Sequence, residues 1–371
     1  MKCEIEFLPV GDASKAGDAI VIRYGEPDGF NVMTIDGGNM ASGELAVEHI
    51  RKQFGHHIYI DHAVLTHCDA DHASGLREIL NEIEVKNLWL NAPWAFVSEC
   101  RPYFLDKTIS DERLAKKIRD EYPIISEIVE TAQQKGIPIK CLFAGDTIGP
   151  FHVLSPHREF YVALVPQFDR MPEPDQEAIE AAHFWIGKQE LSAFGALFEA
   201  LKAKAQKWIP ETWEGERLKD GGITNASNES SVILGGQFEH GPVLLTGDAG
   251  VTGLHLAAWQ TEQIGFPLQE FSFVQIPHHG SRRNIGPTIL NRMVGPILAR
   301  GSEPHFSAFV SAPKDDDSHP RKMVLNAFIR RGGKVIATQG TSKIYWGGFP
   351  VRDDYSAAVP TPFSPVVEEY D

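Results

Sequence analysis

Short apolar runs, each ended by a turn, dominate the first part of the chain. The runs at 5–10, 19–24 and 32–35 have the length of strands and stop at Gly-rich turns. Residues 44–54 then carry apolar positions at a helical period, and another apolar run follows at 62–66. This alternation of strands and helix predicts an α/β architecture.

The middle of the chain has a different pattern. Residues 111–135 are charged and helix-forming, and 138–155 return to strand-like runs. The Pro-rich, acidic stretch 166–176 predicts a surface loop, and the Ala-, Glu- and Lys-rich stretch 177–209 predicts a long helix. We therefore expect a helical insertion at 157–222 in a strand-rich core. It would serve as a packed cap, as a contact in a homo-oligomer, or as a substrate lid.

Strand-like runs resume after residue 228. They lie at 231–234, 243–246, 271–276, 306–310 and 334–337. The sequence shows no internal repeat, so we expect a single domain over 1–371 with the insertion inside it.

Composition and charge narrow the class of protein. Of 371 residues, 42% are hydrophobic and 23% are charged, which excludes a disordered chain. The net charge of −15 means that any contact with nucleic acid must come from a local basic patch. The four cysteines include no C-x-x-C pair, which excludes a disulfide scaffold and a thiolate zinc knuckle. With neither a signal peptide nor a membrane span in the sequence, we expect a soluble, cytoplasmic enzyme without membrane contact.

The segment LTHCDADHASGL at 65–76 concentrates metal-binding side chains. His67, Asp69, Asp71 and His72 occupy six positions at the end of an apolar strand. A turn after a strand can direct alternate residues to one point, and imidazole and carboxylate both bind divalent cations. We therefore expect a metal site here, with the alternate residue Cys68 pointing into the core rather than acting as a nucleophile.

This segment and several others resemble one family. HCDADH resembles the H-x-[HD]-x-D-H signature of the metallo-β-lactamase fold, with Asp69 where histidine is commonest. The stretches around it resemble, in order, the hydrolase domain of the bacterial DNA-uptake protein ComEC (Rec2). They are EFLPVGDASKAGDAIVIRYG, TIDGG, NESSVIL, LLTGDAG, PHHGS and SAPKDDDSHP. The resemblance implies a four-layer αββα sandwich of two mixed sheets with outer helices.

The resemblance also implies a site with two divalent ions, in which Asp248 bridges both. The first ion would be bound by His67, Asp69 and Asp248, and the second by Asp71, His72, Asp248 and one of His278 and His279. Adjacent residues on a strand point in opposite directions, so we expect only one of those two histidines to be a ligand. The other would pack or orient a partner.

Two positions stay open in this assignment. The common form of the fold supplies another histidine between the HCDADH segment and Asp248. His152, His157 and His183 lie in that interval without a motif context, and Asn228 could take the place or contact the substrate. The resemblance places Asp36 behind a ligand or a bound water, with a plain turn residue as the alternative.

The oxygen-rich ligand set bears on the metal. Because Asp69 replaces a histidine, the site favours a harder ion such as Mn²⁺, with Zn²⁺ as the alternative. The implied reaction is hydrolysis by a hydroxide held between the two ions, which serves carbonyl and phosphoryl substrates alike.

Three features favour a phosphodiester substrate, either single-stranded DNA or a smaller molecule. The first is the family branch. The second is the group Ser281, Arg282 and Arg283, which offers donors to phosphate oxygens unless these arginines are only solvated. The third is His319, a candidate general acid or phosphate donor, unless it is a surface turn residue. The alternatives are hydrolysis of a lactone, thioester or β-lactam, and a non-catalytic metal-binding module.

Overall fold

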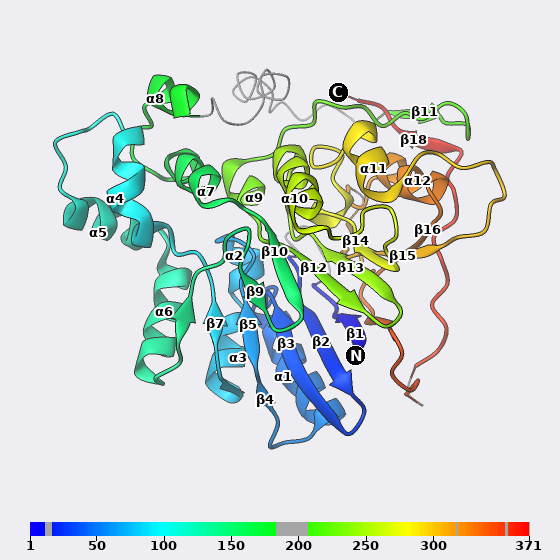
Figure 1. Ribbon diagram of the computed structural model, residues 1–371, viewed down its shortest axis with the longest axis horizontal. Helices are drawn as coiled ribbons and strands as arrows, with labels where there is room; N and C mark the ends of the chain where they lie inside the picture. Colours follow the sequence, from blue (N-terminus) through cyan, green and yellow to red (C-terminus); the bar gives the residue numbers. More distant parts are fainter. Residues whose placement is uncertain (12–16, 183–206, 317, 353–354, 371) are drawn as a thin grey trace.

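The computed structural model describes residues 1–11, 17–182, 207–316, 318–352 and 355–370. Two seven-stranded sheets form its centre (Figure 1). The N-terminal sheet consists, in spatial order, of β17 (Lys343–Tyr345), β1 (Lys2–Phe7), β2 (Ile20–Glu26), β3 (Gly29–Ile35), β5 (His62–Val64), β7 (Leu88–Trp89) and β8 (Ile139–Lys140). Its neighbours are antiparallel from β17 to β3 and parallel from β3 to β8.

The C-terminal sheet has the same mixed plan. Its strands are, in order, β16 (Gly333–Ala337), β15 (Phe306–Val310), β14 (Phe273–Gln275), β13 (Gly241–Leu245), β12 (Ile233–Phe238), β10 (Phe151–Ser155) and β9 (Thr147–Ile148). The pairs from β16 to β13 are parallel, and those from β13 to β9 are antiparallel. In each sheet, therefore, parallel strands meet antiparallel ones near the centre.

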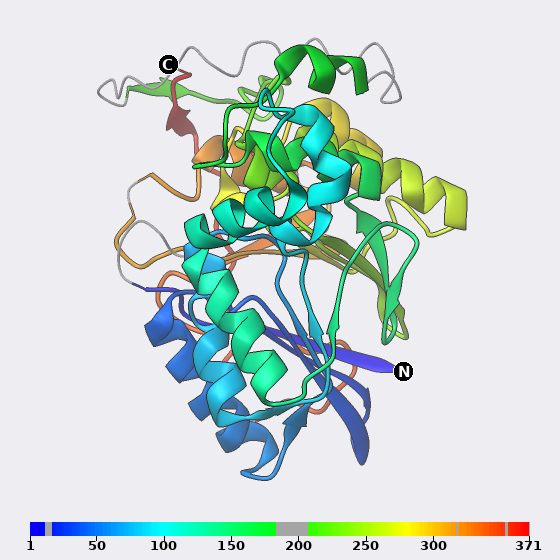
Figure 2. The same ribbon diagram turned by 90° about the vertical axis from the view of Figure 1, so that its left-hand side faces the viewer.

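Alternation along the strands sends apolar side chains to both faces of each sheet. Ile20 and Ile22 of β2 join Val243 and Leu245 of β13 in the core between the sheets. The intervening Val21 and Leu244 face outward instead, toward helices. Figure 2 shows the result as four layers, helices outside and two sheets inside. The predicted αββα sandwich is confirmed.

The helices of the outer layers lie between strands in sequence. The N-terminal sheet is covered by α1 (Met40–Phe54), α3 (Leu76–Glu82) and α6 (Pro123–Gln134), and the C-terminal sheet by α10 (Val251–Ile264), α11 (Pro287–Val294) and α12 (Lys322–Arg330). The other elements are α2 (Ala70–Ala73), β4 (Tyr59–Ile60), β6 (Glu84–Val85), η1 (Pro93–Phe96), α4 (Val97–Cys100), η2 (Arg101–Tyr103), α5 (Asp111–Glu121), α7 (Arg158–Leu164), η3 (Val165–Gln167), α8 (Gln176–Ala182), β11 (Trp208–Pro210), α9 (Ala226–Glu229), η6 (His278–Gly280) and β18 (Val366–Glu368). No described helix is long and apolar enough to cross a membrane.

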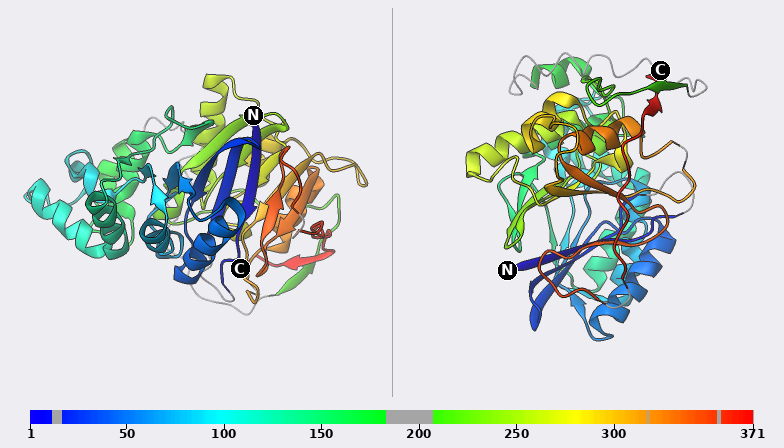
Figure 3. Two further views of the ribbon diagram at one scale, coloured as in Figure 1. Left: turned by 90° about the horizontal axis from the view of Figure 1, so that it is seen from below. Right: turned by 90° about the vertical axis from the view of Figure 1, so that its right-hand side faces the viewer.

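The predicted insertion is helical only in part. Helices α7 and α8 lie within 157–182, whereas 183–206 are outside the described residues. The prediction that the helix extends to residue 209 is wrong for its last residues. Residues Trp208–Pro210 form β11, which pairs with β18 near the C-terminus (Figure 3). A strand partner more than 150 positions away in sequence overrides the local helical composition here.

Candidate metal centre

The end of β3 supplies the residue that supports the HCDADH segment. β3 and β5 are parallel, so Asp36 emerges beside the chain that leaves β5. Its carboxylate accepts hydrogen bonds of 2.7 Å from the amide and from the hydroxyl of Thr66, and one of 2.7 Å from Nδ1 of His72. Asp36 therefore fixes both ends of the segment and hydrogen-bonds to His72, a predicted ligand.

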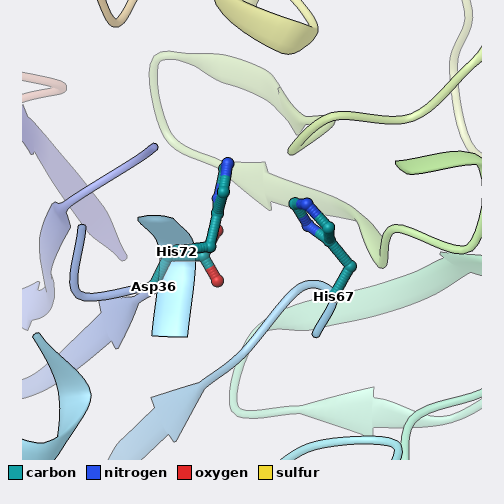
Figure 4. A group of neighbouring side chains, drawn as sticks. All are labelled: Asp36, His67 and His72. Carbon is teal, nitrogen blue, oxygen red and sulfur yellow. The ribbon is translucent and has the colours of Figure 1, made fainter. Parts of the chain in front are cut away.

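Two glycines let these loops approach each other. A Cβ on Gly75 would lie 2.0 Å from the carbonyl oxygen of Gly37, which no side chain can tolerate. The amide of Gly37 donates to the carbonyl of His72 at 2.8 Å. Close contact at these glycines holds α2 against the end of β3, so that His67 and His72 lie side by side with ring centroids 4.2 Å apart (Figure 4).

The C-terminal sheet delivers the facing half of the centre. Asp248 lies in the turn after β13, and the histidine pair follows β14. The side-chain oxygen of Gln275 accepts from the amides of Thr246 and Gly247 at 2.9 and 3.1 Å. Its amide nitrogen donates to Asp18 at 2.8 Å. Gln275 thus holds the turn that carries Asp248 and ties it to the N-terminal sheet.

One oxygen atom lies at the middle of the centre. Oδ2 of the buried Asp248 is 3.3 Å from Nε2 of His72, 3.7 Å from that of His278, 3.8 Å from that of His279 and 4.0 Å from that of His67. Four imidazoles from both sheets therefore converge on one carboxylate.

The other ring nitrogen of each histidine already has an acceptor. Nδ1 lies 2.7 Å from Asp36 in His72, 3.2 Å from the carbonyl of Ser311 in His279, and 2.9 Å from the side-chain oxygen of Asn284 in His278. In His67 it lies 3.0 Å from the Thr66 hydroxyl, whose own hydrogen goes to Asp36. Where Nδ1 carries the ring proton, Nε2 is left with a lone pair; Nδ1 of His278 also lies 2.9 Å from the side-chain nitrogen of Asn228.

Both histidines of the PHHGS segment have Nε2 within 4 Å of Asp248, so they do not point in opposite directions; that only one of them is a ligand stays a prediction. The strand β14 ends at Gln275, before the pair. His278 and His279 have φ angles of 45° and 53°, in the left-handed region that non-glycine residues rarely occupy. The rule of alternating directions applies to a strand and fails in this turn. A strained turn of this kind is typical of functional sites.

The donor set fits a divalent cation. Among the buried side-chain atoms without a hydrogen-bond partner are Nε2 of His67, His72 and His279 and Oδ1 of Asp248. Lone pairs gathered without a donor are costly when buried, and a metal ion satisfies them all at once. In addition, Asp18, His72 and Asp248 can offer ligand atoms within 4.8 Å of one another, and so can Asp71, His72 and His279.

The electrostatic environment differs from one side chain of the centre to the next. Burial opposes ionisation of Asp248, but the surrounding imidazoles hold its pKa well below its usual range. Burial and the neighbouring His72 lower the pKa of His67 to about 4. For His72 burial acts the same way, but Asp248 and Asp36 outweigh it and raise the pKa. The carboxylates that attract a proton to this ring would equally attract a metal ion.

Asp69 lies at the edge of the cluster. Its Oδ2 is 3.7 Å from Nε2 of His67, and its Oδ1 accepts a hydrogen bond of 2.5 Å from the Ser227 hydroxyl. Burial raises the pKa of Asp69. The side chain of Asp69 is one-third exposed and lies beside His67, where it could bind the first of the two predicted ions.

No described histidine fills the place of the missing ligand. His152 packs near Phe266 and His157 near Trp259, with ring centroids 6.2 and 5.3 Å apart, and His183 lies outside the described residues. The side-chain nitrogen of Asn228 instead lies 2.9 Å from Nδ1 of His278. Asn228 therefore contacts a histidine of the centre.

The predicted substrate-binding residues 281–283 differ in their exposure and in their contacts. Ser281 is buried, and Arg283 is exposed next to it. Arg282 donates to the carbonyl of Glu369 at 2.8 Å and lies over the ring of Tyr370, so it holds the C-terminal segment.

His319 lies beside the centre. Its ring stacks parallel to that of His278 with centroids 6.3 Å apart, and its Nδ1 is 3.4 Å from Asp316. Burial lowers the pKa of His319 to about 4, so this imidazole is neutral at pH 7. Cys68 is buried, with its thiol donating to the carbonyl of Asn91, as expected of a core residue.

Four supporting residues escaped sequence reasoning: Asp18, Thr66, Gln275 and Asn284. Asp18 ends the second Gly-Asp turn of the first motif, and Asn284 closes the Ser-Arg-Arg-Asn stretch. The motifs contained both, but nothing local indicates their partners. Asp18 and Gln275 are 257 positions apart in the chain.

Comparison with known proteins gives structural neighbours only. No family model matches the chain, and no curated protein matches it. A hydrolase, AbOPH, of the beta lactamase superfamily is 19% identical over 37% of this chain, with a TM-score of 0.26; the alignment spans about half, 46%, of that protein. A putative metallo-beta-lactamase from Thermotoga maritima is 11% identical over 74% of this chain and 95% of its own, with a TM-score of 0.34. A long form of RNase Z from yeast is 13% identical over 92% of this chain and 41% of its own, with a TM-score of 0.35.

Proposed function

We propose that the chain is a metal-dependent hydrolase that binds two divalent ions between its two sheets. The observation that carries the proposal is the carboxylate of Asp248, surrounded by four imidazoles whose Nε2 atoms all lie within 4.0 Å of it. His67, Asp69 and Asp248 would hold one ion, and Asp71, His72, Asp248 and the histidine pair the other. Such ions would activate water and offset the charge that develops on the substrate.

The residues around this centre would fix its geometry. Asp36 orients His72, Asn284 orients His278, and Gln275 holds the turn of Asp248. His319 lies beside His278 with Nδ1 next to Ser318 and Asp316, so its neutral ring could accept a proton or a hydrogen bond at Nε2. None of these roles requires a serine or cysteine nucleophile.

For the metal itself we propose Mn²⁺. Two of the three predicted ligands of the first ion, Asp69 and Asp248, are carboxylates, and oxygen ligands suit a harder cation. Asp69→His should shift the preference toward Zn²⁺. We would measure the affinity of the chelated protein for each ion by calorimetry. An unchanged ratio of Mn²⁺ to Zn²⁺ affinity would contradict the hardness argument.

For the substrate we propose a phosphodiester, either single-stranded nucleic acid or a smaller molecule. The exposed Arg283 and the neighbouring His319 support it, whereas Arg282 is engaged elsewhere. Because Arg282 is taken by the C-terminal segment, a carbonyl substrate remains the second candidate.

One assay distinguishes these substrates. The chelated protein would be given Mn²⁺, Mg²⁺ or Zn²⁺ and tested on labelled single-stranded DNA, bis-p-nitrophenyl phosphate, a lactone and a β-lactam. We expect metal-dependent phosphodiester cleavage that falls at least about 100-fold in Asp71→Ala. Asp120→Ala, an exposed aspartate on α5, is the matched control and should keep full activity. Turnover of only the carbonyl substrates would refute the phosphodiester proposal.

A further inference from the structure

A buried aspartate lies next to the metal centre, and the proposed function gives it no part. Asp18 ends the second Gly-Asp turn of the first motif, just before β2, and is 2% exposed. This turn lies against the start of α2, because a Cβ on Gly17 would be 1.8 Å from the carbonyl oxygen of Asp71. The close approach, which only glycine permits, brings Asp18 beside the segment that carries Asp71 and His72.

The carboxylate of Asp18 lies within reach of the same ion as two predicted ligands. Asp18, His72 and Asp248 each offer a ligand atom, and these three atoms all lie within 4.8 Å of one another. All three residues are buried. Because a bond from a divalent metal to oxygen or nitrogen is about 2.1 Å long, two ligands of one ion lie up to about 4.2 Å apart. Small shifts of these side chains would therefore let all three bind one ion.

The surroundings of Asp18 supply no cationic side chain. Among the described residues its one hydrogen-bond donor is the neutral side-chain amide of Gln275, at 2.8 Å, and no lysine or arginine forms an ion pair with it. An ionised carboxylate has about four lone-pair sites on its two oxygens, so one hydrogen bond leaves most of its capacity free. Burying a carboxylate without a counter-charge is costly. A metal ion held beside His72 would supply that charge.

Gln275 gives Asp18 a second connection to the centre. The side-chain oxygen of Gln275 already accepts from the amides of Thr246 and Gly247, so its nitrogen is left to face Asp18. This side chain therefore links Asp18 to the turn that carries Asp248. Support of this turn is the alternative role of Asp18, and it predicts different behaviour from that of a ligand.

We propose that Asp18 is a further ligand of the second ion, beside His72 and Asp248. The assignment rests on the proposed function and gives this ion three carboxylates, those of Asp18, Asp71 and Asp248. Zn²⁺ is usually bound by four ligands, whereas Mn²⁺ suits an octahedral, oxygen-rich set of six. Asp18 therefore helps to set the preference of the centre for the harder ion.

The first test is calorimetric titration of the chelated full chain with Mn²⁺. Asp18→Asn keeps an oxygen that can accept from Gln275 but removes the charge, and Asp18→Ala removes both. We expect each variant to lose affinity by at least about tenfold, since even residues that only orient a ligand cost that much. The control Asp61→Asn removes a buried carboxylate before β5, at the opposite end of that strand from His67, and should leave the affinity unchanged.

A second measurement reports the water bound to Mn²⁺. Removal of a ligand opens a coordination position that water fills, so the relaxation rate of water protons per bound Mn²⁺ should rise in Asp18→Ala. A residue that only supports the turn would leave this rate unchanged. Thermal melting of the metal-free proteins would show that each variant is folded.

The outcomes separate this ligand from the proposed function. Wild-type affinity in Asp18→Asn, or an unchanged relaxation rate in Asp18→Ala, would overturn the ligand and leave the proposed function standing. A wild-type chain that binds neither Mn²⁺ nor Zn²⁺ would overturn both. Metal binding that depends on Asp18, in a chain that cleaves none of the substrates, would support the ligand and refute only the hydrolase.

Discussion

Asn284 shows how a buried residue behind the cluster can orient a proposed metal ligand. It is fully buried, and its amide nitrogen donates to the carbonyls of Asp248 and Ala249 at 2.8 and 3.3 Å. Its oxygen must therefore face Nδ1 of His278 at 2.9 Å, which places the proton there and frees Nε2.

Asn284→Ala should accordingly lower the affinity for Mn²⁺ about 10- to 100-fold, because His278 loses the acceptor that fixes its tautomer. Calorimetric titration of chelated protein would measure this. Asn81→Ala, on the exposed surface, is the control. An unchanged affinity in the folded Asn284 variant would refute the positioning role.

At the level of single residues, the sequence predicts which side chains gather at the centre better than it predicts the residues that orient them. The strand ends and the resemblance predict that His67, His72, Asp248 and one histidine of the pair 278–279 lie together, and the structure brings these residues together with both histidines of the pair. Asn284 and Gln275 act through side chains that contact backbone far away in sequence, which no local pattern shows. For His278 and His279 the direction of each side chain depends on a left-handed turn beyond the strand end.

Among the elements, helix α10 begins at an unusual cap. The carboxylate of Glu229 accepts from the amide of Gly253 at 2.5 Å, in the first turn of the helix. A Cβ on Gly250 would lie 1.8 Å from this carboxylate, so only glycine fits there. Burial raises the pKa of Glu229 to about 7, although the backbone amides of Gly253 and Thr252 favour its charged form. The fold therefore binds a proton that the unfolded chain releases.

The raised pKa predicts the direction of a pH effect on stability. Between about pH 4.5 and 7 the unfolded chain loses this proton while the folded chain keeps it, so folding weakens as pH rises. Relative to Glu229→Gln, the wild type should lose on the order of 2 kcal/mol of unfolding free energy between pH 5 and 8. Urea denaturation in chelator would measure it. A difference between the wild type and Glu229→Gln that does not change with pH would contradict the assignment.

The elements themselves were largely predictable. The helix expected at 44–54 is α1, and the strand expected at 306–310 is β15. The apolar run of β15 is largely buried, and in α1 Val47 and Ile50 are buried while Leu45 is exposed. The end of the predicted long helix is wrong because β11 gains its hydrogen bonds from β18, and only the tertiary fold brings that strand near.

On the scale of the whole molecule, the metal centre joins the two halves of the sandwich. His67 and His72 follow strands of the N-terminal sheet, and Asp248, His278 and His279 follow strands of the C-terminal sheet. An ion bound by both sets stabilises the folded chain and not the unfolded one.

Adding Mn²⁺ to chelated protein at about 100 times its dissociation constant should therefore add about 2.7 kcal/mol and raise the melting temperature by several degrees. Differential scanning calorimetry would show the shift. In His72→Ala the shift should shrink sharply. A shift of equal size in both proteins would place the bound ion elsewhere.

Metal stoichiometry tests the central claim most directly. The chain would be stripped with chelator, dialysed against Mn²⁺ or Zn²⁺, and analysed by mass spectrometry for metal per chain, beside the charge-neutral variant Asp248→Asn. We predict two ions per wild-type chain and at most one, weakly held, in the variant, because Asp248 faces all four imidazoles. A wild-type chain that retains no more metal than Asp248→Asn would contradict the account.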